Sequence, residues 1–442
     1  MDSSSNSLNK AVPIAQQERI TLIDSIRGIA LLGILLMNIV VFGIPFPAFL
    51  KLSVLHEIGT INEKAWFLIE WPLEGTMRAI FSMLFGAGII LFTSRFEKRG
   101  EGMLVADYFM RRQLWLLVFG LINAFIFLWV GDILFEYALA GMALFAFRNL
   151  SPKKLMIAAG IVLMIATARD NRDLYIQKAI VTKGEAIEKL DPTVIKLTEK
   201  QKDAFAEMKS FKEVNSLLTQ QQLYEKNLRQ TSGNFKEVYN NLSDRAMNLE
   251  FYFGYFKIWD YIQFMLLGMA LFKLGILTGK VASKIYWWLF IVGLGGGLII
   301  SYYRLQPELL YKFNDFDLAK HVSFDYYAIS RTFRSIGIFG LILLLYKSGY
   351  FKWLFALTRP VGQMAFTNYL MQSVLCGLFF YGFGFGMIGK LQRYELYYVV
   401  AVVWVVEICW SHLWLKYFRF GPLEWLWRSL TYWKMQQIKR TL

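Results

Sequence analysis

Long runs of apolar residues alternate with short polar segments along almost the whole chain. The first run, LIDSIRGIALLGILLMNIVV, is typical of a membrane-spanning helix. A hydrocarbon core of about 30 Å needs roughly 20 helical residues. On this criterion the pattern predicts ten spans, with two residues, Gly131 and Asp132, as a tight turn between the third and the fourth. The predicted limits are 22–43, 75–94, 113–130, 133–148, 154–169, 253–277, 285–304, 326–346, 360–382 and 396–415.

One long polar segment interrupts the apolar pattern. Residues 170–252 carry Glu and Lys at helical spacing and few glycines, which predicts exposed amphipathic helices. Two interpretations stay open: an outer cap over a site, or a variable insertion. The predicted organisation is a cytoplasmic tail at 1–21, five spans in 22–169, the polar insertion at 170–252, five spans in 253–415 and an interfacial segment at 416–442.

The basic residues gather in alternate loops. The predicted short outer loops carry few of them, whereas the predicted inner loops and C-terminal segment hold nineteen: Arg95, Lys98, Arg99, Arg111, Arg112, Arg148, Lys153, Lys154, Lys280, Lys284, Lys347, Lys352, Arg359, Lys416, Arg419, Arg428, Lys434, Lys439 and Arg440. Cytoplasmic loops of membrane proteins carry such an excess, so both termini are predicted to be cytoplasmic. The net charge of +15 therefore orients the protein in its lipid bilayer, and we expect no nucleic-acid partner.

Composition supports an all-α, polytopic membrane protein. The 442 residues are 56% hydrophobic and only 18% charged, with a mean hydropathy of +0.39. Soluble domains are about 45–50% apolar and about 25% charged. The start of the chain lacks the basic region of a signal peptide, so the first run is expected to be an uncleaved span. Cys376 and Cys409 lie in apolar segments, so neither a disulfide framework nor a zinc site is expected.

Two polar residues lie within the first apolar run. Arg27 and Asn38 are eleven residues apart, so they share one helix face at roughly 16 Å. Asp24 is placed for an ion pair with Arg27, and Gly28 and Gly33 allow a neighbouring helix to approach closely. A charge in hydrocarbon costs several kcal/mol, so Arg27 either faces the bundle interior or anchors the run at the inner interface.

Further polar residues fall at membrane depth in the other spans. They are Glu74, Arg78, Asn123, Asp132, Glu136, Asp260, Arg331, Asn368, Gln372 and Glu407. We predict a polar cavity that opens outward among five of them, with interhelical ion pairs as the competing interpretation. The five are Glu74, Arg78, Asp132, Asp260 and Arg331.

Candidate bases and metal ligands are scarce. The chain has three histidines, and His56, which follows the first span, is the best placed to reach an outer cavity as a general base. A lone histidine in a loop is more often plain surface. The sequence contains no metal-ligand cluster, phosphate loop or nucleophile elbow, so we expect no metal and no bound cofactor.

Several segments together resemble a known family. IDSIRGIALLGILLMN, IFSMLFGAGI, GDILFEYAL, GQMAFTNYLMQS and GPLEWLWRSLTY are similar to the YeiB-like membrane proteins, which carry domain of unknown function 418. The resemblance runs along most of the chain except 170–250. It implies a bacterial protein of the cytoplasmic (inner) membrane.

The first span also resembles, more remotely, those of transmembrane acyltransferases. In the acyltransferase 3 family an arginine is followed eleven residues later by a histidine implicated in transfer. Arg27 matches the arginine, but Asn38 stands at the histidine position, and Asn123 stands where many YeiB-like chains are expected to have histidine. These departures leave the proton carrier unidentified.

Two main functional hypotheses follow, and a structural membrane component is a third. In the first, an acyl group passes from cytoplasmic acyl-CoA, a co-substrate, to an extracytoplasmic small-molecule or glycan acceptor. Arg27, Arg112 and Arg359 would contact coenzyme phosphates, and Asp132, Glu74 or His56 would deprotonate the acceptor. In the second, the cavity transports a small polar or lipid-linked solute without chemistry. The sequence does not predict the oligomeric state.

Overall fold

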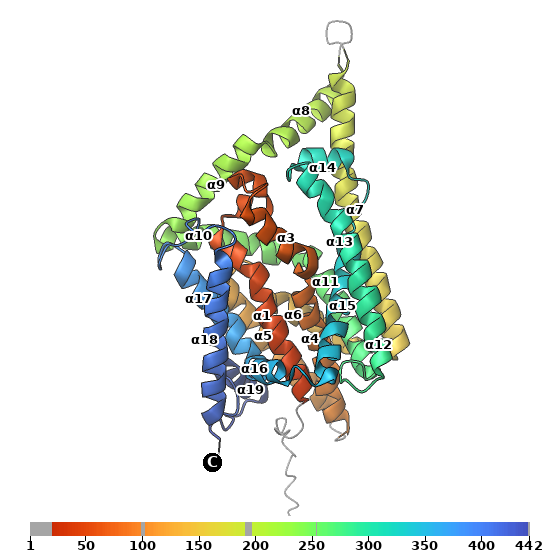
Figure 1. The fold of residues 1–442 in the computed structure, drawn as a ribbon, viewed down its shortest axis with the longest axis vertical. Coiled ribbons are helices and arrows are strands. Elements are labelled where there is room, and N and C mark those ends of the chain that lie inside the picture. Colours follow the sequence, from red (N-terminus) through yellow and green to blue (C-terminus); the bar gives the residue numbers. More distant parts are fainter. Residues whose placement is uncertain (1–19, 99–101, 191–196, 253, 441–442) are drawn as a thin grey trace, which may run out of the picture.

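The structure is a computed structural model that describes residues 20–98, 102–190, 197–252 and 254–440. Within these ranges the chain is helical and contains no β-sheet. Upright helices form a bundle, three sloping helices arch over one end, and the last helix lies at the other end, near the C-terminus (Figure 1). We call these the α8 end and the α19 end. Residues 1–19 of the predicted tail at 1–21 and the loop residue Arg99 lie outside the described residues.

The helices differ widely in length. In chain order they are α1 (Thr21–Gly43), α2 (Phe46–Leu50), η2 (Leu52–Leu55), α3 (Ile61–Leu73), α4 (Thr76–Lys98), α5 (Gly102–Phe125), α6 (Leu134–Leu144), η3 (Phe145–Phe147), α7 (Pro152–Glu188), α8 (Glu199–Val214), α9 (Leu217–Ser232), α10 (Phe235–Met247), η4 (Asn248–Tyr252), α11 (Gly254–Lys273), α12 (Ser283–Trp288), η5 (Leu289–Gly295), α13 (Gly296–Leu310), α14 (Asp315–His321), α15 (Tyr327–Ser348), α16 (Lys352–Gln363), α17 (Ala365–Phe380), α18 (Leu396–Tyr417) and α19 (Pro422–Tyr432).

The protein is an all-α polytopic membrane protein, as the apolar runs predict. Among the described residues, five helical stretches are long and apolar enough to cross a bilayer, and shorter apolar helices accompany them. The long stretches are Thr21–Gly43, Ile61–Glu97, Ser283–Leu310, Tyr327–Ser348 and Leu396–Tyr417. The number of ten spans and the cytoplasmic placement of both termini stay predictions.

Several predicted boundaries differ from the structure, and three of the differences change the form of a span. The turn between the third and fourth predicted spans is an irregular segment, residues 126–133, which folds inward and buries Trp129 against Phe42. The predicted span at 154–169 does not end there, because α7 continues unbroken to Glu188. The predicted span at 360–382 is two helices, α16 and α17, which meet at Met364. A hydropathy window detects none of these features, because the residues involved stay apolar or helix-forming.

The polar insertion forms helices, as its charge spacing predicts. α8, α9 and α10 each begin after a residue whose side chain caps the helix: Thr198, Ser216 and Asn234. These three helices slope from the top of α7 back to the bundle (Figure 1). Tyr224 of α9 is buried, and the Gly382 amide donates to the Thr231 carbonyl, so the arch rests on the bundle.

Glycines set the closest helix contacts. A Cβ atom on Gly28 of α1 would overlap the Thr358 carbonyl of α16, and one on Gly362 would overlap the Asp24 carbonyl. Gly33 faces the Met77 side chain of α4. The predicted role of Gly28 and Gly33 in close packing is therefore confirmed, and α1 is held between α16 and α4.

Candidate functional site

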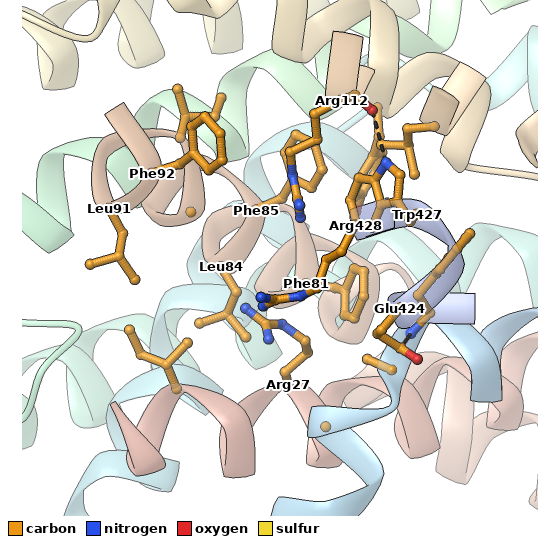
Figure 2. A pocket seen from close by; sticks show the side chains of 18 of the residues that line it. Arg27, Phe81, Leu84, Phe85, Leu91, Phe92, Arg112, Glu424, Trp427 and Arg428 are labelled. Atoms are coloured by element: carbon orange, nitrogen blue, oxygen red, sulfur yellow. Dashed lines mark hydrogen bonds between the residues drawn. The ribbon is translucent and has the colours of Figure 1, made fainter. Parts of the chain in front are cut away.

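A cavity of about 250 Å³ lies at the α19 end, between α1, α4, α5, α17 and α19. Arg27 of α1, Arg112 of α5 and Arg428 of α19 line it, and their guanidinium groups point toward one another in its centre (Figure 2). We call it the arginine cavity. It brings together two of the predicted phosphate contacts, Arg27 and Arg112, and adds Arg428, which was not predicted as a contact.

The arginine cavity carries an excess of positive charge. Arg27 pairs with Asp24 at 3.2 Å. Among the described residues, no carboxylate lies within ion-pair distance of the Arg112 guanidinium, whose carbon lies 3.6 Å from the centre of the Trp427 ring. Stacking on an aromatic face holds a guanidinium in place but leaves its N–H groups available to an anion.

Helix α19 closes the cavity and is fixed by two sets of hydrogen bonds. The Trp427 indole N–H donates to the Arg112 carbonyl at 2.9 Å. The Glu424 carboxylate accepts from the amides of Phe366 and Thr367, at 2.7 and 3.0 Å, and from the Thr367 hydroxyl at 2.6 Å. These groups begin α17, whose N-cap residue Met364 offers no side-chain cap. Burial raises the pKa of Glu424 above its usual value. The helix predicted to be interfacial is thus packed against α5 and α17.

Away from the arginines the cavity is apolar and ends at two tyrosines. Phenylalanine and leucine side chains of α4 form one wall (Figure 2), and Tyr137 and Tyr369 complete the lining. The Tyr369 hydroxyl lies 3.4 Å from an Asp132 carboxylate oxygen. Asp132 also accepts from the Asn123 amide at 2.7 Å and from the Phe135 backbone at 2.9 Å. Asp132 and Asn123 therefore lie behind Tyr369 and do not line the cavity themselves.

A second cavity, of about 310 Å³, lies nearer the α8 end. Three carboxylates line it, those of Glu70, Glu74 and Glu308, together with Arg304 and Tyr327. We call it the acidic cavity. It contains Glu74 but none of the other four residues predicted to enclose an outward cavity.

Three of those four residues form ion pairs between helices. Asp260 of α11 pairs with Arg331 of α15 and lies 3.4 Å from Arg78 of α4. Arg331 donates to the Tyr327 hydroxyl, which donates to Glu74 at 2.7 Å. The competing interpretation of these residues as interhelical ion pairs therefore describes Arg78, Asp260 and Arg331, and the network borders the acidic cavity.

The remaining predicted residues near the surface line neither cavity. His56 is exposed and lies 3.2 Å from the Gln221 amide. Arg359 is exposed at the α19 end. Asn38 is half-buried on α1, and the arginine cavity contains only Arg27 of the predicted pair.

Predicted residues of the ninth span connect helices. The Asn368 amide donates to the Ser411 hydroxyl and accepts from the Trp410 indole. Gln372 donates to Glu407 at 3.1 Å. These contacts hold α17 against α18 and give Asn368 and Gln372 a packing role.

Glu136 of α6 is buried beside Tyr137 and lines neither cavity.

Sequence reasoning missed several cavity residues. Glu424 and Arg428 stand one helical turn apart in the C-terminal segment, and nothing in that spacing shows that they face residues more than 300 positions away. Arg304 and Glu308 have the same spacing near the end of a long apolar run. The only indication in the sequence was that each pair of charged residues stands at or just after the end of an apolar run.

Comparison with known proteins decides the family. Residues 271–434 match the family model described as protein of unknown function (DUF418). The uncharacterized protein YxaH of Bacillus subtilis is 30% identical, over 97% of this chain and 98% of its own. The chain belongs to the DUF418 family. The uncharacterized protein YeiB of Escherichia coli is 29% identical over 94% of this chain and 96% of its own, and no solved structure matches.

The DUF418 match confirms the resemblance expected from the sequence motifs. The matched residues include Glu424, Trp427 and Arg428 of the arginine cavity. Arg27 and Arg112 precede the matched region. The DUF418 relatives named here are bacterial proteins.

Proposed function

We propose that this DUF418 protein binds a phosphate-bearing amphiphile in the arginine cavity, with acyl-CoA as its ligand and acyl donor. The observation that carries the proposal is the convergence of Arg27, Arg112 and Arg428 on one point (Figure 2). Three guanidinium groups that face one another repel one another, even though Arg27 also pairs with Asp24. A phosphate or pyrophosphate accepts paired N–H bonds from each and removes that repulsion.

The apolar part of the cavity supports an amphiphile over free phosphate. Phe81, Leu84 and Phe85 offer contact surface for a thioester arm and a short acyl chain. Trp427 closes one side above Arg112. A ligand with phosphates at one end and an apolar arm at the other matches this division of the lining.

Tyr369 and Asp132 are the groups proposed to handle the proton. In acyl transfer the acceptor oxygen attacks the thioester carbon, the carbon–sulfur bond breaks, and the proton of the acceptor hydroxyl passes to the departing thiolate. Tyr369 lines the cavity, and Asp132 lies one hydrogen bond behind it. Of the three predicted bases, Asp132 is therefore the one this proposal uses.

The proposal also gives an orientation. Acyl-CoA is a cytoplasmic metabolite, so the arginine cavity and the α19 end would face the cytoplasm in a bacterial inner membrane. That orientation agrees with the one predicted from the basic loops. The acceptor would be a small molecule or glycan that approaches from the α8 end.

The test is coenzyme A binding by the full-length protein in nanodiscs, measured by isothermal titration calorimetry. Arg112→Gln removes charge-assisted bonds worth about 1.5–3 kcal/mol, so affinity should fall roughly 10- to 150-fold. Arg359→Gln is the matched control, because Arg359 is an exposed arginine outside the cavity lining. A wild-type protein that does not bind coenzyme A, or equal losses in both variants, would contradict the proposal.

Transport is the second candidate, and one observation favours it. The arginine cavity and the acidic cavity both lie along α1, and α4 lines the arginine cavity and begins two residues after Glu74 of the acidic cavity. Arg78 of α4, which pairs with Asp260 in the network with Arg331, stands in the sequence between Glu74 of the acidic cavity and Phe81 of the arginine cavity. Proteoliposomes loaded with labelled acetyl-CoA distinguish the two: a covalent acetyl product supports transfer, and release of the intact compound supports transport.

A further inference from the structure

The acidic cavity differs in charge from the arginine cavity and from the protein as a whole. Its lining comes from α1, α2, α3, α13, α15, α18 and the neighbouring loops. Its volume of about 310 Å³ suits a small organic molecule. The protein carries a net charge of +15, yet three carboxylates face this space.

Most of the charged groups around the acidic cavity already have partners. Arg304 donates to Glu70 at 3.0 Å. The buried Arg393 pairs with the buried Glu57 at 2.7 Å. Because these carboxylates hold the two arginines of the lining, the arginines are not offered to a ligand.

Glu74 is also engaged, but Glu308 is not. Glu74 accepts from the Tyr327 hydroxyl at 2.7 Å and lies 3.5 Å from Arg334. Among the described residues, nothing donates a hydrogen bond to the Glu308 carboxylate and no cation lies within ion-pair distance of it. The Glu308 side chain is partly exposed, so it can meet a ligand that arrives from water. One negative charge of the lining is therefore left for an occupant.

Aromatic rings supply the rest of the wall. Trp66 and Phe313 pack edge to face, with ring centres 5.2 Å apart, and Phe49, Tyr327 and Tyr397 complete the set. Arg304 already lies over the Tyr327 ring at 5.4 Å. Rings of this kind attract a positive group through their π faces and an aliphatic skeleton through contact area.

We propose that the acidic cavity is a binding site for a small organic cation that carries an amine. Glu308 forms the ion pair with the ammonium group, and the rings around Trp66 contact the carbon skeleton. An anion is disfavoured because the carboxylates repel it. A neutral compound of the same shape leaves the Glu308 charge without a partner. The proposal goes beyond acyl-CoA binding and does not depend on it, because no residue of the arginine cavity takes part.

The test uses ethanolamine as the probe, with ethylene glycol and glycolate as neutral and anionic matches of nearly the same size. Binding to the full-length protein in nanodiscs is measured by isothermal titration calorimetry. Ethanolamine should bind, and the other two should bind at least tenfold more weakly. Equal binding of ethylene glycol would overturn the proposal, because the site would then recognise hydroxyl groups. Absence of ethanolamine binding would overturn it as well.

Three variants locate the site. Glu308→Gln keeps the shape of the side chain and should weaken ethanolamine binding at least tenfold, whereas Glu199→Gln, on the exposed start of α8, should leave it unchanged. An unchanged melting temperature shows that the Glu308→Gln protein is folded. Arg112→Gln should also leave ethanolamine affinity unchanged, which separates this site from the coenzyme site. Wild-type affinity in Glu308→Gln would refute the assignment.

Discussion

Glu424 offers the sharpest test of how the arginine cavity is closed. Replacing it by alanine removes the acceptor of three hydrogen bonds at the start of α17. The amides of Phe366 and Thr367 then lose their partner in a packed interface, and each unsatisfied buried donor costs about 1–3 kcal/mol. We therefore expect Glu424→Ala to lose about 2–4 kcal/mol of stability, which corresponds to a fall of several degrees in Tm.

Glu424→Gln should behave differently from Glu424→Ala. The glutamine oxygen still accepts from both amides, and its NH2 group can donate to the Thr367 hydroxyl, so the geometry persists. Burial raises the pKa of Glu424, which means that it penalises the charged carboxylate, and glutamine does not carry that penalty. Near neutral pH, the free energy of unfolding of Glu424→Gln should lie within about 1 kcal/mol of the wild-type value, and the two Tm values should be close.

The raised pKa of Glu424 also determines how the stability of the protein changes with pH. A raised carboxyl pKa means that the folded state keeps its proton longer than the unfolded state. Stability therefore falls as pH rises from the unfolded value of about 4.3 through the folded pKa, and this slope should be absent in Glu424→Gln. Tm from intrinsic fluorescence, measured in detergent at several pH values, checks both statements. An alanine variant as stable as the glutamine variant would refute the capping role of Glu424.

Three further predictions concern packing, charge burial and orientation. Gly28→Leu should prevent accumulation of folded protein, judged by size-exclusion chromatography, because any side chain there meets the α16 backbone; Gly160→Ala, which meets nothing, should be tolerated. Arg393→Met leaves the buried Glu57 without its partner and should cost about 3–5 kcal/mol, read as a drop in Tm. If the segment 170–252 is extracytoplasmic as predicted, a Lys200→Cys variant should react with a membrane-impermeant maleimide in intact cells. Labelling only after cell lysis would show the opposite orientation.

Apolar run length was enough to predict the regular spans. The first run was expected at 22–43 and forms α1 at Thr21–Gly43, because one long stretch of apolar residues leaves helix as the only way to satisfy its backbone in lipid. The same reasoning failed at residues 126–133. There the chain satisfies its backbone locally, as when the Trp129 amide donates to the Asn123 carbonyl, and hydropathy does not report such bonds.

The candidate site was predictable only in part. Arg27 and Arg112 were expected to meet phosphates, since arginines near an inner interface are costly without a partner. Their convergence with Arg428 depends on how α19 folds back across α5, where Trp427 bonds to the Arg112 carbonyl, and no local pattern encodes a contact over 300 residues. Ion pairs such as Arg331–Asp260 were among the stated alternatives, but sequence alone could not choose between a pair and a cavity.

The length of α7 sets how far the arch stands from the membrane. α7 has 37 residues, so it measures about 55 Å at 1.5 Å per residue, whereas a hydrocarbon core is about 30 Å thick. It runs close to the long axis of the molecule (Figure 1), so if the predicted span at 154–169 crosses the core, about 25 Å of α7 projects beyond it. The far end of α7, and the part of α8 that packs against it where Met208 meets Val181, then lie in the aqueous compartment beyond the hydrocarbon core.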